Sequence, residues 1–354
     1  MNNIDKLDNL TSWADIYCVA GLSDKTPKEL LELKSLCLED EDYASYPDKH
    51  GGSATYIPDE IDALQNIEEL TIDLRFVSKL PSTICNLINL KTLHIFLCTP
   101  IETLPNDMYK LKNLETITLQ GERFKTVPPQ LLSLPNLKSL HLGSSQLKEF
   151  PKEILEFKNL ETLVLSYNKL KEIPPEISVL KKLKHLVLQQ NELQTLPDEL
   201  AHLQNLKYIE LSDNLFSSFP KALIDLKNLS ILSLCNNQFQ TFPMEITRMN
   251  QLKNLSCSSN NFDAVPREIC KLTNLERLNL AYNNLKDLPE DFINLENLTH
   301  LYLNNNNFSE FPMEICKLKK LACLDLKFNH LKAIPKEIYK STNIKNLYIN
   351  GNDI

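Results

Sequence analysis

Proline recurs in this chain at a nearly fixed interval, and this register limits the possible folds more than any other feature. Successive members of the register are 23 residues apart, except for one interval of 24 after Pro81. Repeats of about 20–50 residues stack on one another because a single copy cannot bury its own apolar side chains. The register consists of Pro58, Pro81, Pro105, Pro128, Pro151, Pro174, Pro197, Pro220, Pro243, Pro266, Pro289, Pro312 and Pro335.

A typical copy reads LETLVLSYNKLKEIPPEISVLKK and runs from Leu160 to Lys182. Alternate residues at its start are apolar, which predicts a short strand with one buried face. Leu163 and Leu165 then point inward, while Thr162 and Val164 remain on the outer surface. Pro174 suits the first position of a short helical turn, where a missing N–H costs nothing.

This copy resembles the leucine-rich repeat, whose signature LxxLxLxxNxL is met by LETLVLSYNKL and LERLNLAYNNL. The continuation LPxEIxxLxNL is similar to that of intracellular Ras-group and related bacterial members, and the resemblance covers residues 33–354. It implies an α/β solenoid, a curved horseshoe of about 14 copies of 23 residues. A parallel β-sheet would line the concave face, and short helical turns and loops would line the convex face.

The resemblance also implies a ladder of inward-pointing asparagines, one in each of the later copies. A buried amide that lacks partners costs about 1–3 kcal/mol, so we expect each to bond to the neighbouring turns. Replacing Asn305, which lies one position outside the ladder, is expected to be neutral. The ladder would consist of Asn168, Asn191, Asn214, Asn237, Asn260, Asn283, Asn306, Asn329 and Asn352.

Two domains are expected: an N-terminal helical cap at residues 1–32 and the repeat domain at 33–354, with an insertion near 46–57. The cap would contain helices around Ile4–Val19 and Pro27–Leu31. Trp13, Ile16 and Tyr17 are expected to cover the first repeat.

The first copies depart from the pattern, because the asparagine position holds Arg75, Cys98, Glu122 and Ser145. A bulge is expected at Cys98–Ile101, where one copy has an extra residue. The chain stops at Ile354, part of the way through a copy with a polar last strand. That end is either a minimal polar cap or a sign of a longer natural protein.

Composition and charge exclude several classes of function. Six glycines, and no phosphate-binding glycine motif, argue against a nucleotide cofactor, and we expect no cofactor at all. A pI near 5.5 argues against nucleic acid, and no apolar run reaches the length of a membrane span. Residues 1–62 hold 14 acidic and 5 basic residues, which makes an acidic head with a net charge of −9.

The cysteines and the N-terminus bear on location. Nine cysteines, without the spacing of a small disulfide scaffold, fit a reducing compartment. The N-terminal residues lack a secretory signal pattern. We therefore expect a cytoplasmic protein, or one delivered into a host cell without a cleaved signal peptide.

No catalytic or metal-ligating set emerges from the outward positions. His94 and His141 are two strands apart, about 10 Å, which is too far for one metal ion. Cys323 and Asp325 match the Cys-x-Asp motif of bacterial ubiquitin ligases with leucine-rich repeats, but here the motif lies inside a repeat strand. The acidic run 39–42 lacks the spacing of a calcium loop. We expect neither catalytic residues nor a metal site.

The outward strand positions near the centre combine apolar, aromatic and charged side chains that the fold itself does not require. Tyrosine and arginine are enriched where proteins bind one another. We therefore predict a partner-binding surface formed by Val164, Tyr167, His185, Val187, Tyr208, Glu210, Ile231, Arg277, His300 and Tyr302.

These features favour a non-catalytic scaffold or adaptor that binds another protein along its inner face. The resemblance implies a role in signalling or in bacterial interaction with a host. One alternative is the recognition portion of a larger enzyme, such as a ubiquitin ligase, whose catalytic domain is absent from this chain. A structural or self-associating surface protein is a third possibility, and it would require export.

Overall fold

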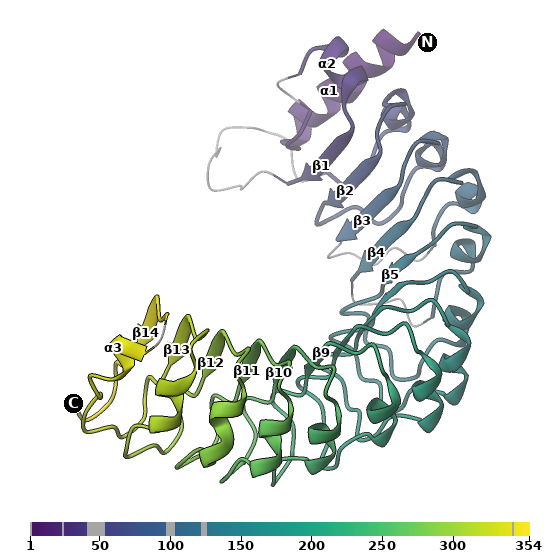
Figure 1. Cartoon of the computed structure of the whole chain (residues 1–354). Helices are drawn as coiled ribbons and strands as arrows, with labels where there is room; N and C mark the ends of the chain where they lie inside the picture. The colour runs from purple at the N-terminus through teal and green to yellow at the C-terminus, as the bar shows by residue number, and fades with distance from the viewer. Residues whose placement is uncertain (1, 23–24, 41–53, 97–102, 122–125, 342) are drawn as a thin grey trace. The chain divides into compact units, whose positions relative to one another are not determined.

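The computed structural model describes residues 2–22, 25–40, 54–96, 103–121, 126–341 and 343–354. The chain forms two compact units, Met1–Lys169 and Leu170–Ile354. In each unit, strands lie on one side of the repeats and short turns on the opposite side (Figure 1). This arrangement confirms the predicted solenoid of parallel strands and short helical turns.

Unit 1 begins with two helices, α1 (Asn3–Tyr17) and α2 (Pro27–Glu32). Asn2 and Thr26 begin them with capping boxes, in which side chain and backbone bond to each other three residues apart. Both helices fall within the expected cap. That residues 1–32 form a domain of their own stays a prediction.

The inner face of α1 covers the first repeats. Trp13 is buried, and its ring centroid lies 6.3 Å from that of Tyr17 and 6.3 Å from that of Tyr56. The prediction for Ile16 is wrong, because that side chain is 57% exposed. It lies on the solvent side of the helix, away from the face that Leu7, Leu10 and Ala14 bury.

Six parallel strands of unit 1 follow one another in sequence order. Each aligns with the next without a shift in register, as Ser35 opposite Glu69 and Thr92 opposite Thr116 illustrate. The strands are β1 (Ser35–Glu39), β2 (Glu69–Asp73), β3 (Thr92–Phe96), β4 (Thr116–Gln120), β5 (Ser139–His141) and β6 (Thr162–Val164).

Eight parallel strands of unit 2 repeat the same pattern. Inward leucines such as Leu186 and Leu278 are fully buried, so each strand buries one face as predicted. The strands are β7 (His185–Val187), β8 (Tyr208–Glu210), β9 (Ile231–Ser233), β10 (Asn254–Ser256), β11 (Arg277–Asn279), β12 (His300–Tyr302), β13 (Cys323–Asp325) and β14 (Asn346–Tyr348).

Short 3-10 helices return the chain after the strands. In unit 1 they are η1 (Asp59–Ala63), η2 (Ser82–Asn86), η3 (Asn106–Lys110), η4 (Pro129–Ser133) and η5 (Lys152–Glu156). In unit 2 they are η6 (Pro175–Val179), η7 (Asp198–His202), η8 (Lys221–Asp225), η9 (Met244–Arg248), η10 (Arg267–Lys271), η11 (Glu290–Asn294) and η12 (Met313–Lys317). A short α-helix, α3 (Ile338–Ser341), takes this place in the last copy.

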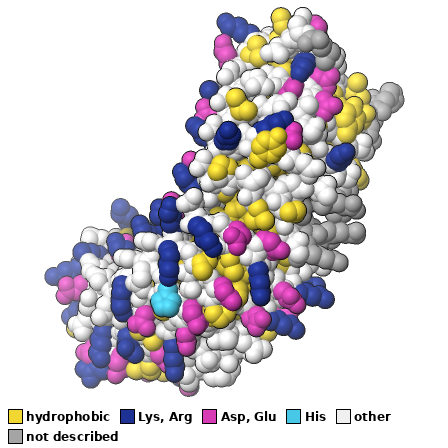
Figure 2. Space-filling view, turned by 90° about the vertical axis from the view of Figure 1, so that its right-hand side faces the viewer, with side chains coloured by type: hydrophobic (Ala, Val, Ile, Leu, Met, Phe, Trp, Pro, Cys, Tyr) yellow, Lys and Arg dark blue, Asp and Glu magenta, His cyan; other side chains and the backbone are white. Residues whose placement is uncertain are grey.

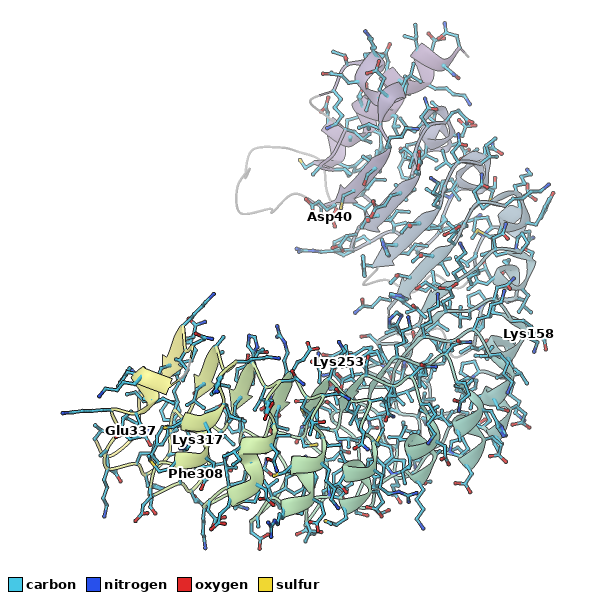
Figure 3. All side chains as sticks on the ribbon, viewed as in Figure 1. Asp40, Lys158, Lys253, Phe308, Lys317 and Glu337 are labelled. Atoms are coloured by element: carbon cyan, nitrogen blue, oxygen red, sulfur yellow. The ribbon has the colours of Figure 1, made fainter. Side chains whose placement is uncertain are left out.

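The register prolines lie one residue earlier than predicted. Pro174 occupies the position before η6, with φ −71°, and its carbonyl accepts a bond of 3.0 Å from the N–H of Ile177. Proline suits this site because the turn needs its carbonyl and not its missing N–H. In Figure 3, Lys253 lies on the strand side of unit 2 and Lys317 on the turn side.

The predicted asparagine ladder is confirmed in the later copies. In unit 1, the amide nitrogen of Asn168 donates to the carbonyls of Leu142 and Leu165, at 2.9 and 3.0 Å. Its oxygen accepts from the N–H of Leu147 at 3.0 Å. Asn260 is an exception, since its buried side-chain oxygen has no partner among the described residues.

Three predictions fall wholly or partly outside the described residues. They are the insertion near 46–57, the bulge at Cys98–Ile101 and the acidic run 39–42. No helix in the described part of the chain is long and apolar enough to cross a membrane.

Candidate functional site

The structure places the predicted binding residues at outward strand positions or directly after a strand. Val164, on β6, and Tyr167 belong to unit 1. The other predicted residues lie on five strands of unit 2, where the inward neighbour of each is buried. They are His185 and Val187 on β7, Tyr208 and Glu210 on β8, Ile231 on β9, Arg277 on β11, and His300 and Tyr302 on β12.

A hollow of about 300 Å³ opens on the strands of unit 2, from β8 to β12. Five of the predicted residues line this strand-face hollow: Tyr208, Glu210, Ile231, Arg277 and Tyr302. The other five predicted residues are outside its lining. Sequence analysis missed four polar lining residues, namely Ser233, Asn254, Ser256 and Asn279.

The missed residues have a sequence signal. They occupy the same outward columns as Tyr208 and Glu210, but with short side chains between the longer ones of the flanking strands. Ser233 and Ser256 lie between Glu210 and Tyr302 in one column. Small side chains between large ones produce depth on an otherwise even sheet.

Glu210 is held within its own repeat. The Tyr208 hydroxyl donates a hydrogen bond of 3.0 Å to one carboxylate oxygen, and the N–H of Ser212 donates one of 2.9 Å to the other. Burial and the Glu210 charge together raise the pKa of Tyr208, which keeps its hydroxyl protonated as a donor. The pair therefore fixes the orientation of both side chains.

Arg277 lies at the opposite end of the strand-face hollow and is exposed. Its guanidinium forms no ion pair or hydrogen bond with any residue that the structure describes. The neighbouring carboxylates are engaged elsewhere: Glu276 pairs with Lys253 at 2.9 Å, and an oxygen of Asp325 accepts from the N–H of Lys327 at 3.0 Å. The hollow thus presents an unpaired positive charge.

His300 adds no charge to this end of the hollow at neutral pH. Partial burial, and then the charge of Arg277, lower the pKa of the His300 imidazole. Its Nδ1 lies 2.9 Å from the Thr299 hydroxyl, and its ring lies 6.4 Å from that of Tyr302. On β7 and β8, the rings of His185 and Tyr208 are 6.3 Å apart.

Exposed aromatic side chains also occupy left-handed backbone positions directly before ladder asparagines. Tyr167 in unit 1, and Tyr282 and Phe328 in unit 2, have φ values of 58°, 53° and 52° and are 50–59% exposed. Bulky residues rarely adopt this region, which costs them about 1–2 kcal/mol. Other copies place Gln190, Asp213, Asn236, Ser259 or Asn305 there.

The ring of Phe328 rests on the backbone of the last copy. A Cβ added at Gly351 would lie 2.5 Å from a ring carbon of Phe328, so only glycine leaves room for this contact. Nearby, the Lys327 ammonium lies 4.5 Å from the centre of the Tyr348 ring. These exposed aromatic side chains give unit 2 apolar area on its strand side.

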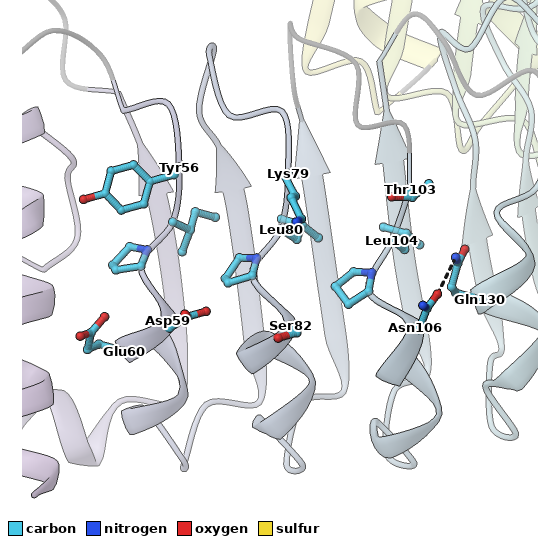
Figure 4. A pocket seen from close by; sticks show the side chains of 14 residues that line it. Tyr56, Asp59, Glu60, Lys79, Leu80, Ser82, Thr103, Leu104, Asn106 and Gln130 are labelled. Atoms are coloured by element: carbon cyan, nitrogen blue, oxygen red, sulfur yellow. Dashed lines mark hydrogen bonds between the residues drawn. The ribbon is translucent and has the colours of Figure 1, made fainter. Parts of the chain in front are cut away.

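A second, larger hollow of about 930 Å³ lies in unit 1, beside the prolines that precede η1, η2 and η3 (Figure 4). Sequence analysis missed this hollow, although Pro58, Pro81 and Pro105 of the proline register line it. Tyr56, Lys79 and Thr103 lie along it, and Gln130 donates a hydrogen bond of 3.3 Å to Asn106.

The side chains considered above as catalytic or metal-ligating groups are either hydrogen-bonded to neighbours or protonated. His94 bonds to Thr118 at 2.8 Å and His141 to Ser139 at 2.9 Å, and burial lowers the pKa of His141. Burial raises the pKa of the Cys323 thiol, and a protonated thiol is a poor nucleophile. No three metal-ligating side chains gather among the described residues.

On the side of the molecule drawn in Figure 2, basic and acidic side chains alternate over most of the surface, with hydrophobic ones between them. Interspersed charges of this kind are typical of an ordinary solvated surface. This view gives no reason to place a binding site on that side.

Comparisons with known proteins agree with the repeat pattern. The family model described as Leucine rich repeat matches more than half of the chain, at residues 112–170, 135–193, 158–216, 181–239 and 250–308. No curated protein matches the chain.

Solved structures are similar over most of the chain. A leucine-rich repeat protein of Leptospira interrogans is 34% identical, covering 93% of this chain and 86% of that chain with a TM-score of 0.76. An internalin of Listeria monocytogenes, InlF, is 22% identical, covering 97% and 94% with a TM-score of 0.68. The ectodomain of the receptor kinase GASSHO1/SCHENGEN3 from Arabidopsis thaliana, in complex with CASPARIAN STRIP INTEGRITY FACTOR 2, is 24% identical with a TM-score of 0.61. The alignment covers 91% of this chain but only 42% of that ectodomain chain.

Proposed function

Because this chain belongs to the leucine-rich repeat family, we propose that it is a non-catalytic scaffold that binds another protein through the strands of unit 2. The strand-face hollow carries this proposal. It gathers Tyr208, Ile231, Tyr302 and an unpaired Arg277 on strands that hold them rigidly. Tyrosine and arginine dominate the binding energy of protein interfaces.

Rigid repeats suit this role for a physical reason. Side chains held on strands lose little further freedom when a partner binds, which limits the entropic cost of association. The Arabidopsis receptor ectodomain, which has this fold, forms a complex with another factor. That likeness supports a protein as the class of partner and does not identify it.

The biological setting belongs to the same proposal. The repeat type supports a role in signalling or in bacterial contact with a host, and the cysteine usage supports a reducing compartment. We place the protein in the cytoplasm, or in a host cell that it enters without a cleaved signal peptide. The recognition portion of a larger enzyme would use the same surface.

An affinity capture experiment tests the proposal. The full-length chain and a Tyr208→Ala/Ile231→Ala/Arg277→Ala variant are each used to capture proteins from a cell lysate, with Lys320→Ala on the turn side as the control. We expect a protein that is retained by the wild type and the control but not by the triple variant. Equal retention by all three chains would contradict binding through the strands of unit 2.

A further inference from the structure

The two charged side chains that line the strand-face hollow differ in one respect. Glu210 is engaged by the Tyr208 hydroxyl and the Ser212 N–H, whereas Arg277 has no partner in the described part of the chain. A guanidinium carries five planar N–H donors, and two of them match the oxygens of a carboxylate. Arg277 is therefore a recognition group that none of the described residues engages.

The acidic residues nearest in the sheet do not neutralise Arg277. Glu276, its neighbour on the chain, is paired with Lys253 on the preceding repeat at 2.9 Å. Asp325 lies two strands away, about 10 Å at the usual spacing between strands, where one of its oxygens accepts from the N–H of Lys327, and Glu210 lies three strands away, about 14 Å. Arg277 lines the hollow, and its charge, after partial burial, contributes to the lowered pKa of the neighbouring His300.

The remaining lining describes the rest of the ligand. Ile231, two strands from Arg277, supplies an apolar contact, and Asn254 lies directly between them. Ser233 and Ser256 have short side chains in the neighbouring outward column. Tyr208 and Tyr302 stand at the two ends. The hollow lies open on the strands and is small, so it suits a few side chains of a peptide segment.

Building on the proposed function, we propose that the strand-face hollow binds an acidic peptide segment of the partner, with a carboxylate on Arg277 and an apolar side chain on Ile231. Two strand spacings are about 10 Å, and an extended peptide advances about 3.3 Å per residue. Side chains of an extended peptide that face one surface are an even number of residues apart, so the carboxylate and the apolar side chain are two or four residues apart, about 7 or 13 Å. The carboxylate is that of an Asp or Glu side chain within the segment.

Peptide selection on the full-length chain tests the proposal. Two random peptide libraries are displayed, one with the random segment internal and one with it at a free C-terminus. We expect enriched peptides with an acidic residue two or four positions from Ile, Leu, Val or Phe. Enrichment of Asp or Glu in both libraries supports a side-chain carboxylate, and selection from the C-terminal library alone, without Asp or Glu, contradicts it.

Affinities of one selected peptide locate the contact. We expect Arg277→Gln to weaken binding about 10–100-fold. Lys271→Gln removes one charge from η10, on the turn side of the preceding repeat, and should leave the affinity unchanged. Replacing the peptide carboxylate with an amide should weaken binding to the wild type by the same factor. The same replacement should not weaken binding to Arg277→Gln any further.

The outcomes separate this proposal from the proposed function. Selected peptides that lack an acidic group, or that bind wild type and Arg277→Gln equally, overturn the carboxylate contact. If those peptides still lose affinity in Tyr208→Ala, binding at the strands of unit 2 stands. If no peptide depends on any residue of the hollow, both proposals are wrong.

Discussion

The ladder asparagines, Asn260 excepted, connect their own turn to the preceding one through both atoms of the amide. In unit 2, the Asn214 nitrogen donates to the carbonyls of Leu188 and Leu211 at 2.9 and 3.1 Å, and its oxygen accepts from the N–H of Leu193 at 3.0 Å. Removing the amide leaves buried backbone groups on two copies without partners.

We therefore expect Asn214→Ala to lower the free energy of unfolding by about 1–3 kcal/mol, measured by urea denaturation. Asn307→Ala is the matched control, because Asn307 is exposed and follows a ladder residue. Asn305 is unsuitable for that purpose, contrary to the sequence-based expectation. Its φ of 55° favours asparagine over alanine, so alanine there adds a backbone cost. Equal unfolding midpoints for Asn214→Ala and Asn307→Ala would contradict the ladder.

The aromatic residues at left-handed backbone positions offer a substitution that should increase stability. Tyr282 is 57% exposed at φ 53°, a conformation that asparagine adopts more readily. We expect Tyr282→Asn to raise the free energy of unfolding by about 1 kcal/mol. Tyr109→Asn makes the same change at an exposed site with ordinary φ and should give no gain. A loss of stability in Tyr282→Asn would show that its ring contributes to folding.

At the scale of elements, strands and turns were predictable because the repeat fixes both. The spacing of leucines sets the position of each strand, and the prolines set the start of each turn to within one residue. The hollow was not predictable in the same way. Its depth depends on the Tyr208–Glu210 hydrogen bond and on the short side chains of Ser233 and Ser256 between longer neighbours. The exposure of Ile16 depends on how α1 packs, which its own pattern leaves open.

Helix α1 also provides an element-scale test. Trp13 is 4% exposed and packs against the rings of Tyr17 and Tyr56. Because repeats contact only their neighbours, loss of this side chain should loosen the start of unit 1 and spare distant strands. We expect Trp13→Ala to lower the free energy of unfolding of unit 1 by about 3–5 kcal/mol and to speed amide hydrogen exchange in β1 and β2.

The same exchange measurement provides the controls. Strands β10 to β12 of unit 2 should exchange as in the wild type, and Trp13→Phe should keep most of the protection in β1 and β2. Faster exchange throughout both units would contradict local stabilisation by α1.

At the scale of the whole molecule, the cysteines test the proposed compartment. Eight cysteines are free in the described residues, and the ninth, Cys98, lies outside them. Burial raises the pKa of Cys85 and of Cys270 to about 11, so these thiols resist oxidation at neutral pH. Thiol titration of the protein purified from its native source and denatured without reductant should find about nine thiols. A count of seven or fewer would indicate disulfides and contradict the proposed location.

The central claim is that unit 2 binds a protein through the strand-face hollow. Calorimetric titration of a captured partner into the full-length chain and its variants tests this claim most directly. Tyr208→Ala and Arg277→Ala should each weaken binding by about 1–3 kcal/mol with little change in melting temperature, and Lys320→Ala should have no effect. Unchanged affinity in the Tyr208/Ile231/Arg277 triple variant, together with loss of binding when residues 1–110 are altered, would contradict the claim and place the site in unit 1.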